Sequence, residues 1–277
     1  MLQVASGSLR KMHAELSDPV SYQLLLDEQR IDLNAYLGKR IALEFLGSIN
    51  CCFCGRLTKK SFNQGYCYPC FKRLAQCDSC IMSPEKCHYS AGTCREPEWA
   101  DSHCMQDHIV YLANSSGVKV GITRGTQVPT RWIDQGAVQA MPVIRVKTRQ
   151  QSGLVEVILK QHISDRTQWQ RMLKGQIEIL DLAAIWQGLL PLISTELEQL
   201  QDIHGLQAIQ VLERPDVVEL RYPVSQYPDK VKAHNFDKQT RVEGTLMGIK
   251  GQYLMLDTGV INIRKFTAYQ VEFFAEA

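Results

Sequence analysis

The sequence has no apolar run that approaches the roughly 18 residues a helix needs to cross a bilayer, so we expect no membrane partner. Its first residues, MLQVASGSLRKM, lack the apolar core of a secretory signal, which favours a cytoplasmic protein. Hydrophobic residues make up 45% and charged residues 22% of the 277, a composition that excludes global disorder. The formal net charge of +2 points to no partner by itself.

Cysteine is absent from most of the chain, because all ten cysteines lie between Cys51 and Cys104. Disulfide scaffolds normally belong to short exported chains, and this chain is neither short nor visibly exported. Clustered thiols with C-x-x-C spacing in a reducing compartment favour metal binding instead.

The first cysteine set has the spacing of a zinc ribbon. Two C-x-x-C loops are separated by a segment long enough for a hairpin, and four thiolates close a tetrahedral structural site. The predicted ligands are Cys51, Cys54, Cys67 and Cys70, with Cys52 as a spare thiol beside them. Zinc in such a site folds the segment and does no chemistry.

A second structural zinc is predicted directly after the first. Its most economical ligand set is Cys77, Cys80, Cys87 and Cys94. Cys104 or a neighbouring histidine could replace one of these ligands, and an iron–sulfur cluster is the main rival to zinc.

Hydrophobic patterning predicts an α+β chain of several units. In chain order these are a β-rich segment, the cysteine module, a small α/β domain, a helical connector and a β meander or small barrel, at 1–48, 49–106, 107–176, 177–215 and 216–277. Two helices are expected in the α/β part, with Ser152 and Asp165 as N-caps, and Gly188 and Pro191 are expected to break the next apolar stretch.

The two ends of the chain share an apolar pattern at an offset of 230 residues. Leu24, Leu26 and Asp27 align with Leu254, Leu256 and Asp257, and the match continues to Leu43 and Phe273. Two unrelated strand meanders would share such alternation, whereas a true repeat would make the ends two half-barrels.

Positive charge is concentrated between residues 119 and 174, which contain ten Lys or Arg and three Asp or Glu. This distribution is expected of a module that meets phosphates, and equally of a basic solvated face.

The same region resembles the GIY-YIG nuclease superfamily over residues 108–174. The resemblance rests on Ile109-Val110-Tyr111, on Lys119-Val120-Gly121-Ile122-Thr123, on Arg131 and on Glu156. Nearly the whole chain, with GTCREP, KVGITR, RWIDQGA and GIKGQYL, also resembles an uncharacterised bacterial family of unknown function.

The superfamily resemblance implies a three-stranded sheet with flanking helices that cuts phosphodiesters with one Mg²⁺ or Mn²⁺ ion. It assigns Tyr111 to activation of water, Arg131 to the phosphate and Glu156 to the metal. Lys119 stands in place of the second-motif tyrosine, where it either contacts phosphate or marks a module that binds without cutting. The neighbouring side chains expected to contact nucleic acid are Arg124, Trp132 and Gln135.

Three functions remain open at this point. The first is a divalent-metal-dependent endonuclease, and the second is a non-catalytic DNA- or RNA-binding protein. The third is a zinc-stapled protein–protein adaptor. The sequence indicates neither the kind of nucleic acid nor an oligomeric state.

Overall fold

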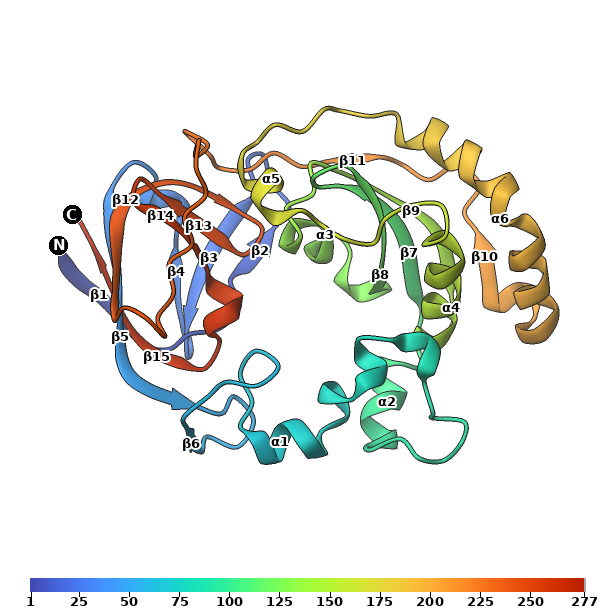
Figure 1. Cartoon of the computed structure of the whole chain (residues 1–277), viewed down its shortest axis with the longest axis horizontal. Helices are drawn as coiled ribbons and strands as arrows, with labels where there is room; N and C mark the ends of the chain where they lie inside the picture. Colours follow the sequence, from blue (N-terminus) through green and yellow to red (C-terminus); the bar gives the residue numbers. More distant parts are fainter. Residues whose placement is uncertain (277) are drawn as a thin grey trace.

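The structure is a computed structural model that describes residues 1–276 of the chain. It is a mixed α+β fold with three sheets. Figure 1 shows a β-barrel-like unit on the left, where both termini lie, and an α/β unit on the right. The cysteine-rich segment runs between them along the bottom of the view. Among the described residues, no helix is long and apolar enough to cross a membrane.

The two ends of the chain form one β unit. Its larger sheet has the order β1-β15-β5-β12-β13-β14, and β2, β3 and β4 form a second, three-stranded sheet. The strands are β1 (Leu2–Ser8), β2 (His13–Glu15), β3 (Ser21–Leu26), β4 (Gln29–Asp32), β5 (Arg40–Asn50), β12 (Arg241–Lys250), β13 (Tyr253–Leu256), β14 (Gly259–Asn262) and β15 (Tyr269–Ala275). Strict alternation of buried and less buried side chains in β3 and β15 turns one face of each inward.

The internal repeat is visible in the strand register. β5 and β15 are antiparallel, and Leu43 pairs directly with Phe273, its equivalent at the offset of 230. The pair on one side, Ile41 with Ala275, is the image of the pair on the other side, Phe45 with Val271. The pairing is therefore symmetric about one point, as an approximate two-fold axis requires.

The turns repeat as well. The Asp27 carboxylate accepts a hydrogen bond from the Ser8 backbone N–H at 3.0 Å, and the Asp257 carboxylate accepts one from Thr245 at 2.9 Å. The short helices η1 (Asn34–Tyr36) and η7 (Ile263–Phe266) follow at equivalent positions. The two ends thus form two similar halves of one β unit.

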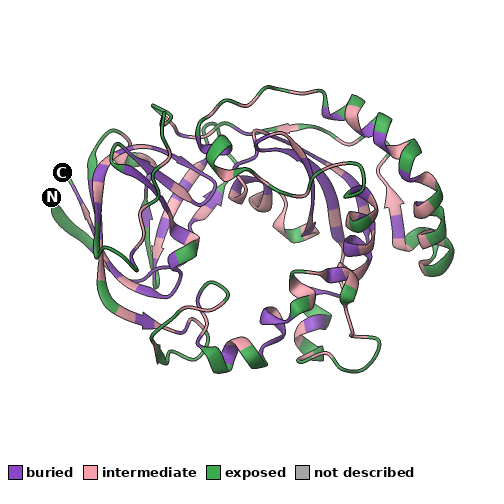
Figure 2. Ribbon diagram, in the orientation of Figure 1, coloured by how far each residue is buried: buried purple, intermediate pink, exposed green. Residues whose placement is uncertain are grey.

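Residues of both ends belong to one hydrophobic core, from Ala5 to Ala275, which also includes α/β-unit residues such as Tyr111 and Trp132. The expectation of separate N- and C-terminal β units is therefore corrected, because neither end has a core of its own. Figure 2 shows the buried strands of the β unit and the α/β unit in purple and much of the cysteine segment in green and pink.

The α/β unit has a five-stranded sheet with β7 (His108–Asn114) between β8 (Val118–Arg124) and β9 (Gln139–Val146). The later strands β10 (Ile209–Val211) and β11 (Val218–Glu219) pair with β9. Helices α4 (Arg149–Leu159) and α6 (Leu182–His204) share a core with one face of the sheet. The helix α3 (Thr130–Asp134) lies on the inner side, next to the β unit (Figure 1).

Three helix predictions are corrected by capping and packing. The N-cap of α4 is Thr148, which forms a capping box with Gln151, whereas Ser152 is buried inside the helix. The helix predicted after residue 164 is shorter than expected and consists of α5 (Trp169–Leu173). Asp165 does not cap this helix, because its carboxylate pairs with Lys160.

Helix α6 continues through Gly188 and Pro191. A proline inside a helix costs about 3 kcal/mol. The helix buries five large side chains, and each contributes about 1.5–3 kcal/mol, so packing outweighs the proline. These are Leu182, Trp186, Leu189, Ile193 and Leu197.

The cysteine-rich segment consists of short elements. They are β6 (Leu57–Thr58), α1 (Tyr68–Arg73), η2 (Ala75–Cys77), η3 (Ser79–Ile81), η4 (Pro84–Lys86) and α2 (Pro97–His103). The only hydrophobic cluster within it consists of four cysteines, Leu74 and two aromatic neighbours. Such a core is too small to fold a segment of this length without a cross-link.

Candidate metal centre and cationic cluster

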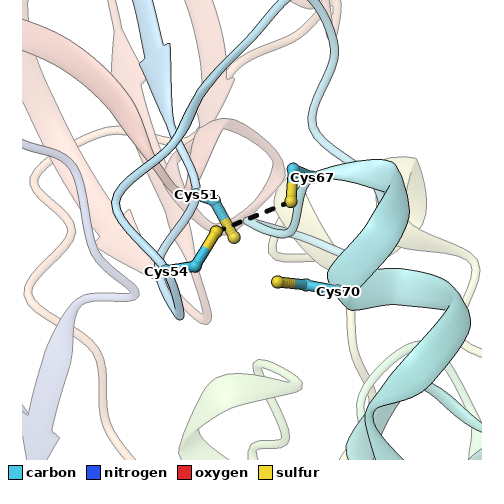
Figure 3. A group of neighbouring side chains, drawn as sticks. All are labelled: Cys51, Cys54, Cys67 and Cys70. Atoms are coloured by element: carbon cyan, nitrogen blue, oxygen red, sulfur yellow. Dashed lines mark hydrogen bonds between the residues drawn. The ribbon is translucent and has the colours of Figure 1, made fainter.

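Four thiols of the first cysteine set gather at one point. The sulfur atoms of Cys51, Cys54, Cys67 and Cys70 all lie within 4.8 Å of one another (Figure 3). The Sγ atoms of Cys54 and Cys67 are 3.7 Å apart. Four thiolates at this separation match the donor set of a tetrahedral zinc site, so this cluster could hold a zinc ion.

Local backbone geometry brings the two pairs together. After Cys54 the chain turns at Gly55, whose φ of 70° favours glycine, and the Gly55 N–H donates to the Cys51 carbonyl at 2.8 Å. The second pair opens helix α1, with Cys67 as its N-cap and Cys70 inside its first turn. The expected ribbon is therefore modified, because a helix start replaces a second β-turn.

Backbone N–H groups favour a thiolate in this cluster. Burial opposes the charged form of Cys51, but the N–H groups of Cys54, Cys67 and Phe53 bring the pKa of Cys51 down to about 6. Burial raises the pKa of the spare thiol Cys52, and the nearby charge of Cys51 adds to this. The environment therefore favours the thiolate at Cys51 and the neutral thiol at its sequence neighbour Cys52.

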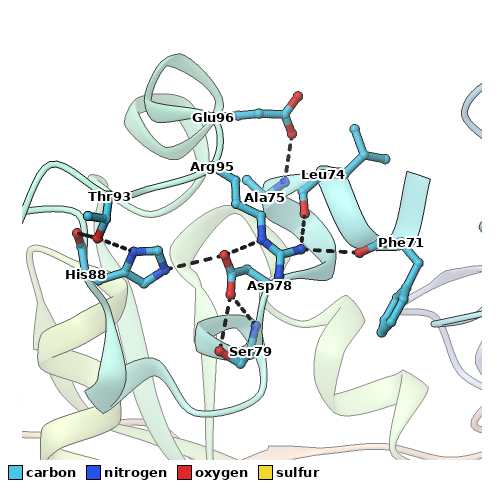
Figure 4. Close-up of polar contacts among 9 residues, drawn as sticks. All are labelled: Phe71, Leu74, Ala75, Asp78, Ser79, His88, Thr93, Arg95 and Glu96. Carbon is cyan, nitrogen blue, oxygen red and sulfur yellow. Dashed lines mark hydrogen bonds and ion pairs between the residues drawn. The ribbon is translucent and has the colours of Figure 1, made fainter. Parts of the chain in front are cut away.

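The second cysteine set is not gathered as predicted. Cys77 packs in one hydrophobic cluster with Cys51, Cys67 and Cys70 of the first set. The second group of ligand atoms within 4.8 Å of one another is formed by Asp78, Cys80 and His88. Its carboxylate is already occupied: Asp78 pairs with Arg95 at 2.7 Å and accepts a hydrogen bond from the Ser79 backbone N–H (Figure 4).

Tyr111 lies on the inner face of β7, directly opposite Gly121 of β8. A Cβ atom at Gly121 would lie 2.6 Å from the tyrosine ring, so only glycine allows this approach. The Tyr111 side chain is fully buried, and its hydroxyl accepts a hydrogen bond from Gln135 Nε2. Burial raises the pKa of Tyr111, while Arg131 acts in the opposite direction.

The other predicted residues surround this tyrosine. Lys119 is 7% exposed, and burial followed by the charge of Arg131 lowers its pKa to about 8. Glu156 acts electrostatically on both Tyr111 and Lys119. Burial raises the pKa of Glu156, and Lys160, 3.5 Å away, opposes that shift. Arg131 and Glu156 therefore both influence the ionisation of Tyr111 and Lys119.

Two further arginines come under the influence of Arg131. Burial and then the charge of Arg131 lower the pKa of Arg264, in η7 of the β unit. Burial also lowers the pKa of Arg149, at the start of α4, and Arg131 contributes to that shift. Neither arginine is among the residues that the sequence analysis assigns to the site.

The three predicted nucleic-acid contacts have different environments. Trp132 is 2% exposed and packs edge-on against Tyr111 in the core, so its indole has no face to offer a base. Gln135 is held by Tyr111. Arg124 remains partly accessible and lines a cavity of about 190 Å³ together with Arg149 and Cys104.

A larger cleft of about 900 Å³ lies between the β unit and the hairpin of the first cysteine cluster. Four cations line it, namely Lys59, Lys60, Arg264 and Lys265. Of its two acidic side chains, Asp134 is paired with Lys11 and Asp237 accepts a hydrogen bond from Tyr269 at 2.7 Å. Arg264 connects this cleft to Arg131 in the α/β unit.

Comparisons with known proteins give a family and no activity. No curated protein and no solved structure matches the chain. Residues 38–271 match the family described as "Protein of unknown function (DUF2797)". That match covers most of the sequence, and the chain belongs to this family.

Proposed function

We propose that this protein binds nucleic acid through the phosphate backbone, at a cationic cluster formed by Lys119, Arg131 and Arg264. One observation carries the proposal: none of these three side chains makes an ion pair within residues 1–276. They come from β8, α3 and η7, three elements of two different units.

Unpaired cations that face one another repel, and partial burial increases the cost of their charge. Lys119 and Arg264 both show this through their lowered pKa values, to which burial and Arg131 contribute. A row of phosphates would neutralise the cluster, and arginine suits phosphate oxygens because its fork binds two at once.

The surroundings extend the same surface. Lys59, Lys60 and Lys265 line the 900 Å³ cleft together with Arg264. In Figure 1 the loop after β6, helix η7 and helix α3 all border the middle of the molecule. A strand of nucleic acid placed there would meet cations from the cysteine segment, the β unit and the α/β unit.

Phosphodiester cleavage is a second candidate, favoured by one specific arrangement. Arg131 and Glu156 both act electrostatically on Tyr111, and Gly121 admits the tyrosine ring. The element order β7-β8-α3-β9-α4 agrees with a sheet flanked by helices, which the GIY-YIG resemblance implies. Glu156 would hold Mg²⁺ or Mn²⁺, since such an ion keeps several waters and needs few protein carboxylates.

Binding is tested with labelled DNA and RNA oligonucleotides by fluorescence anisotropy. Arg131→Gln and Arg264→Gln should each weaken binding about 5- to 100-fold at fixed low salt, as expected for loss of one charged phosphate contact of about 1–3 kcal/mol. Arg30→Gln is the matched control, because Arg30 is exposed on β4 and lies outside the cluster. Equal affinity in all four proteins would refute the cluster.

Cleavage is tested on the same oligonucleotides with Mg²⁺ and Mn²⁺. Glu156→Gln should abolish cutting and leave binding in the absence of metal within a few-fold. Tyr111→Phe should lower the rate without loss of the fold, because the ring remains. Cutting by Glu156→Gln at the parent rate would mean that the activity has another source.

A further inference from the structure

The segment from 78 to 107 has no hydrophobic core. None of its residues belongs to any of the four hydrophobic clusters of the described chain. Its buried apolar residues are limited to Pro84, Ala100 and Cys104. A segment of this length held by short 3₁₀ turns needs a cross-link of another kind.

Backbone contacts place three cysteines of this segment around the start of one helix: the carbonyls of Cys87, of Cys104 and of Ile81, which follows Cys80, all accept hydrogen bonds from Arg149 or Gln150. Cys94 precedes Arg95, which pairs with Asp78, two residues before Cys80. Cys77 instead packs with the first cluster. The geometry therefore exchanges Cys77 for Cys104 in the second set.

Helix α4 holds the backbone around these thiols. The Arg149 N–H donates to the Cys104 carbonyl at 2.8 Å, and its guanidinium donates to the Ile81 carbonyl at 2.6 Å. Gln150 Nε2 donates to the Cys87 carbonyl at 3.2 Å. Gly153 lets η4 lie against the helix, since a Cβ there would be 2.6 Å from the Glu85 nitrogen.

A buried donor at this point has no acceptor. The Nε atom of Arg149 is buried without a hydrogen-bond partner, and Cys104 and Cys80 are among the groups whose charges act on this arginine. A zinc ion held by four thiolates carries a net charge of minus two. Arg149, together with Arg124 in the same 190 Å³ cavity, would balance that charge, and a thiolate would accept the Nε–H.

We propose that Cys80, Cys87, Cys94 and Cys104 form a second structural zinc site, independent of the four-cysteine cluster and of the proposed nucleic-acid binding. Among the described residues no three of these four sulfurs lie within 4.8 Å of one another, so zinc binding has to draw them together. Asp78 and His88 pair with each other at 3.4 Å and are also held by Arg95 and Thr93, so neither is assigned to the zinc (Figure 4).

Metal content of the full-length protein tests the proposal. Elemental analysis should give two zinc ions per chain for the parent, one for Cys104→Ser and two for Cys77→Ser. Cys54→Ser, which removes a ligand of the first cluster, should also retain one. One zinc in the parent, or loss of zinc from Cys77→Ser but not from Cys104→Ser, would overturn the assignment. Iron in place of the second zinc would overturn the choice of metal.

A second measurement needs no variant to fold. The parent loaded with ¹¹³Cd should give two NMR resonances in the region of tetrathiolate sites. A single resonance of that kind would overturn the proposal, and the result says nothing either way about nucleic-acid binding.

Discussion

The β unit and the cysteine segment solve the folding problem in different ways. The β unit brings two distant halves of the chain together around buried side chains such as Leu43 and Phe273, and its order depends on apolar area. The cysteine segment runs between the β unit and the α/β unit and buries almost no apolar area of its own. Its order therefore depends on its thiols. The cluster that could hold a metal thus lies in the region where the hydrophobic pattern runs out.

Removal of metal should cause the largest loss of structure, and this loss should be confined to the cysteine segment. Stripping zinc with a thiol-reactive reagent and a chelator should expose backbone amides of residues 51–77, because structural zinc contributes about 10–16 kcal/mol to small sites. Hydrogen–deuterium exchange with mass spectrometry should show this loss, while peptides from β5 and β15 keep their protection. Equal loss in both regions would mean that the β unit also depends on metal.

Truncation of a core side chain should destabilise the β unit and leave the cysteine segment intact. Phe273→Ala should lower the free energy of unfolding by about 3–5 kcal/mol, because the buried ring packs against Tyr36 at 5.5 Å between centroids. Zinc content should stay unchanged. Phe274→Ala is the matched control on the other face of β15, where its side chain is partly exposed, and it should cost clearly less in a urea titration.

A pH titration should give the smallest effect and should separate binding from stability. The pKa of Lys119 in the folded protein is about 8, below its usual 10.5, so its charge is lost as pH rises through 8. Nucleic-acid affinity should then fall several-fold between pH 7 and 9, since one phosphate contact is lost.

The stability contribution of Lys119 has the opposite sign. Because its pKa is lowered on folding, the cost of its charge is fully present below pH 8 and is relieved between pH 8 and 10.5. Lys119→Arg should remove the step in binding. Lys250→Met should not, although the pKa of the buried Lys250 is also about 8. If the pH-dependent step in binding disappeared in Lys250→Met, the step would belong to Lys250 and the assignment to Lys119 would be wrong.

Local signals in the sequence were sufficient for the first cysteine cluster, because C-x-x-C spacing fixes two sulfurs within each loop. They also located α4, although its start depends on the reciprocal bonds of Thr148 and Gln151. Signals that depend on tertiary contacts were missed. The turn η2 directs Cys77 toward the first cluster, and Arg264 of the β unit comes under the influence of Arg131 only when the β unit and the α/β unit are assembled.

The internal repeat could be predicted only in part from the sequence. Alternation at the offset of 230 left two interpretations open, and the pairing of Leu43 with Phe273 decides between them. The pattern records which residues face inward, whereas the two-fold relation requires the strand register, which alternation alone does not specify.

The salt dependence of nucleic-acid binding by the parent protein tests the central claim most directly. Three phosphate contacts, from Lys119, Arg131 and Arg264, predict that the logarithm of the association constant falls with the logarithm of salt concentration with a slope of about −2 to −3. Arg131→Gln should reduce the slope by about one. A flat response in the parent between 50 and 200 mM salt would contradict the account, and the protein–protein adaptor would then be favoured.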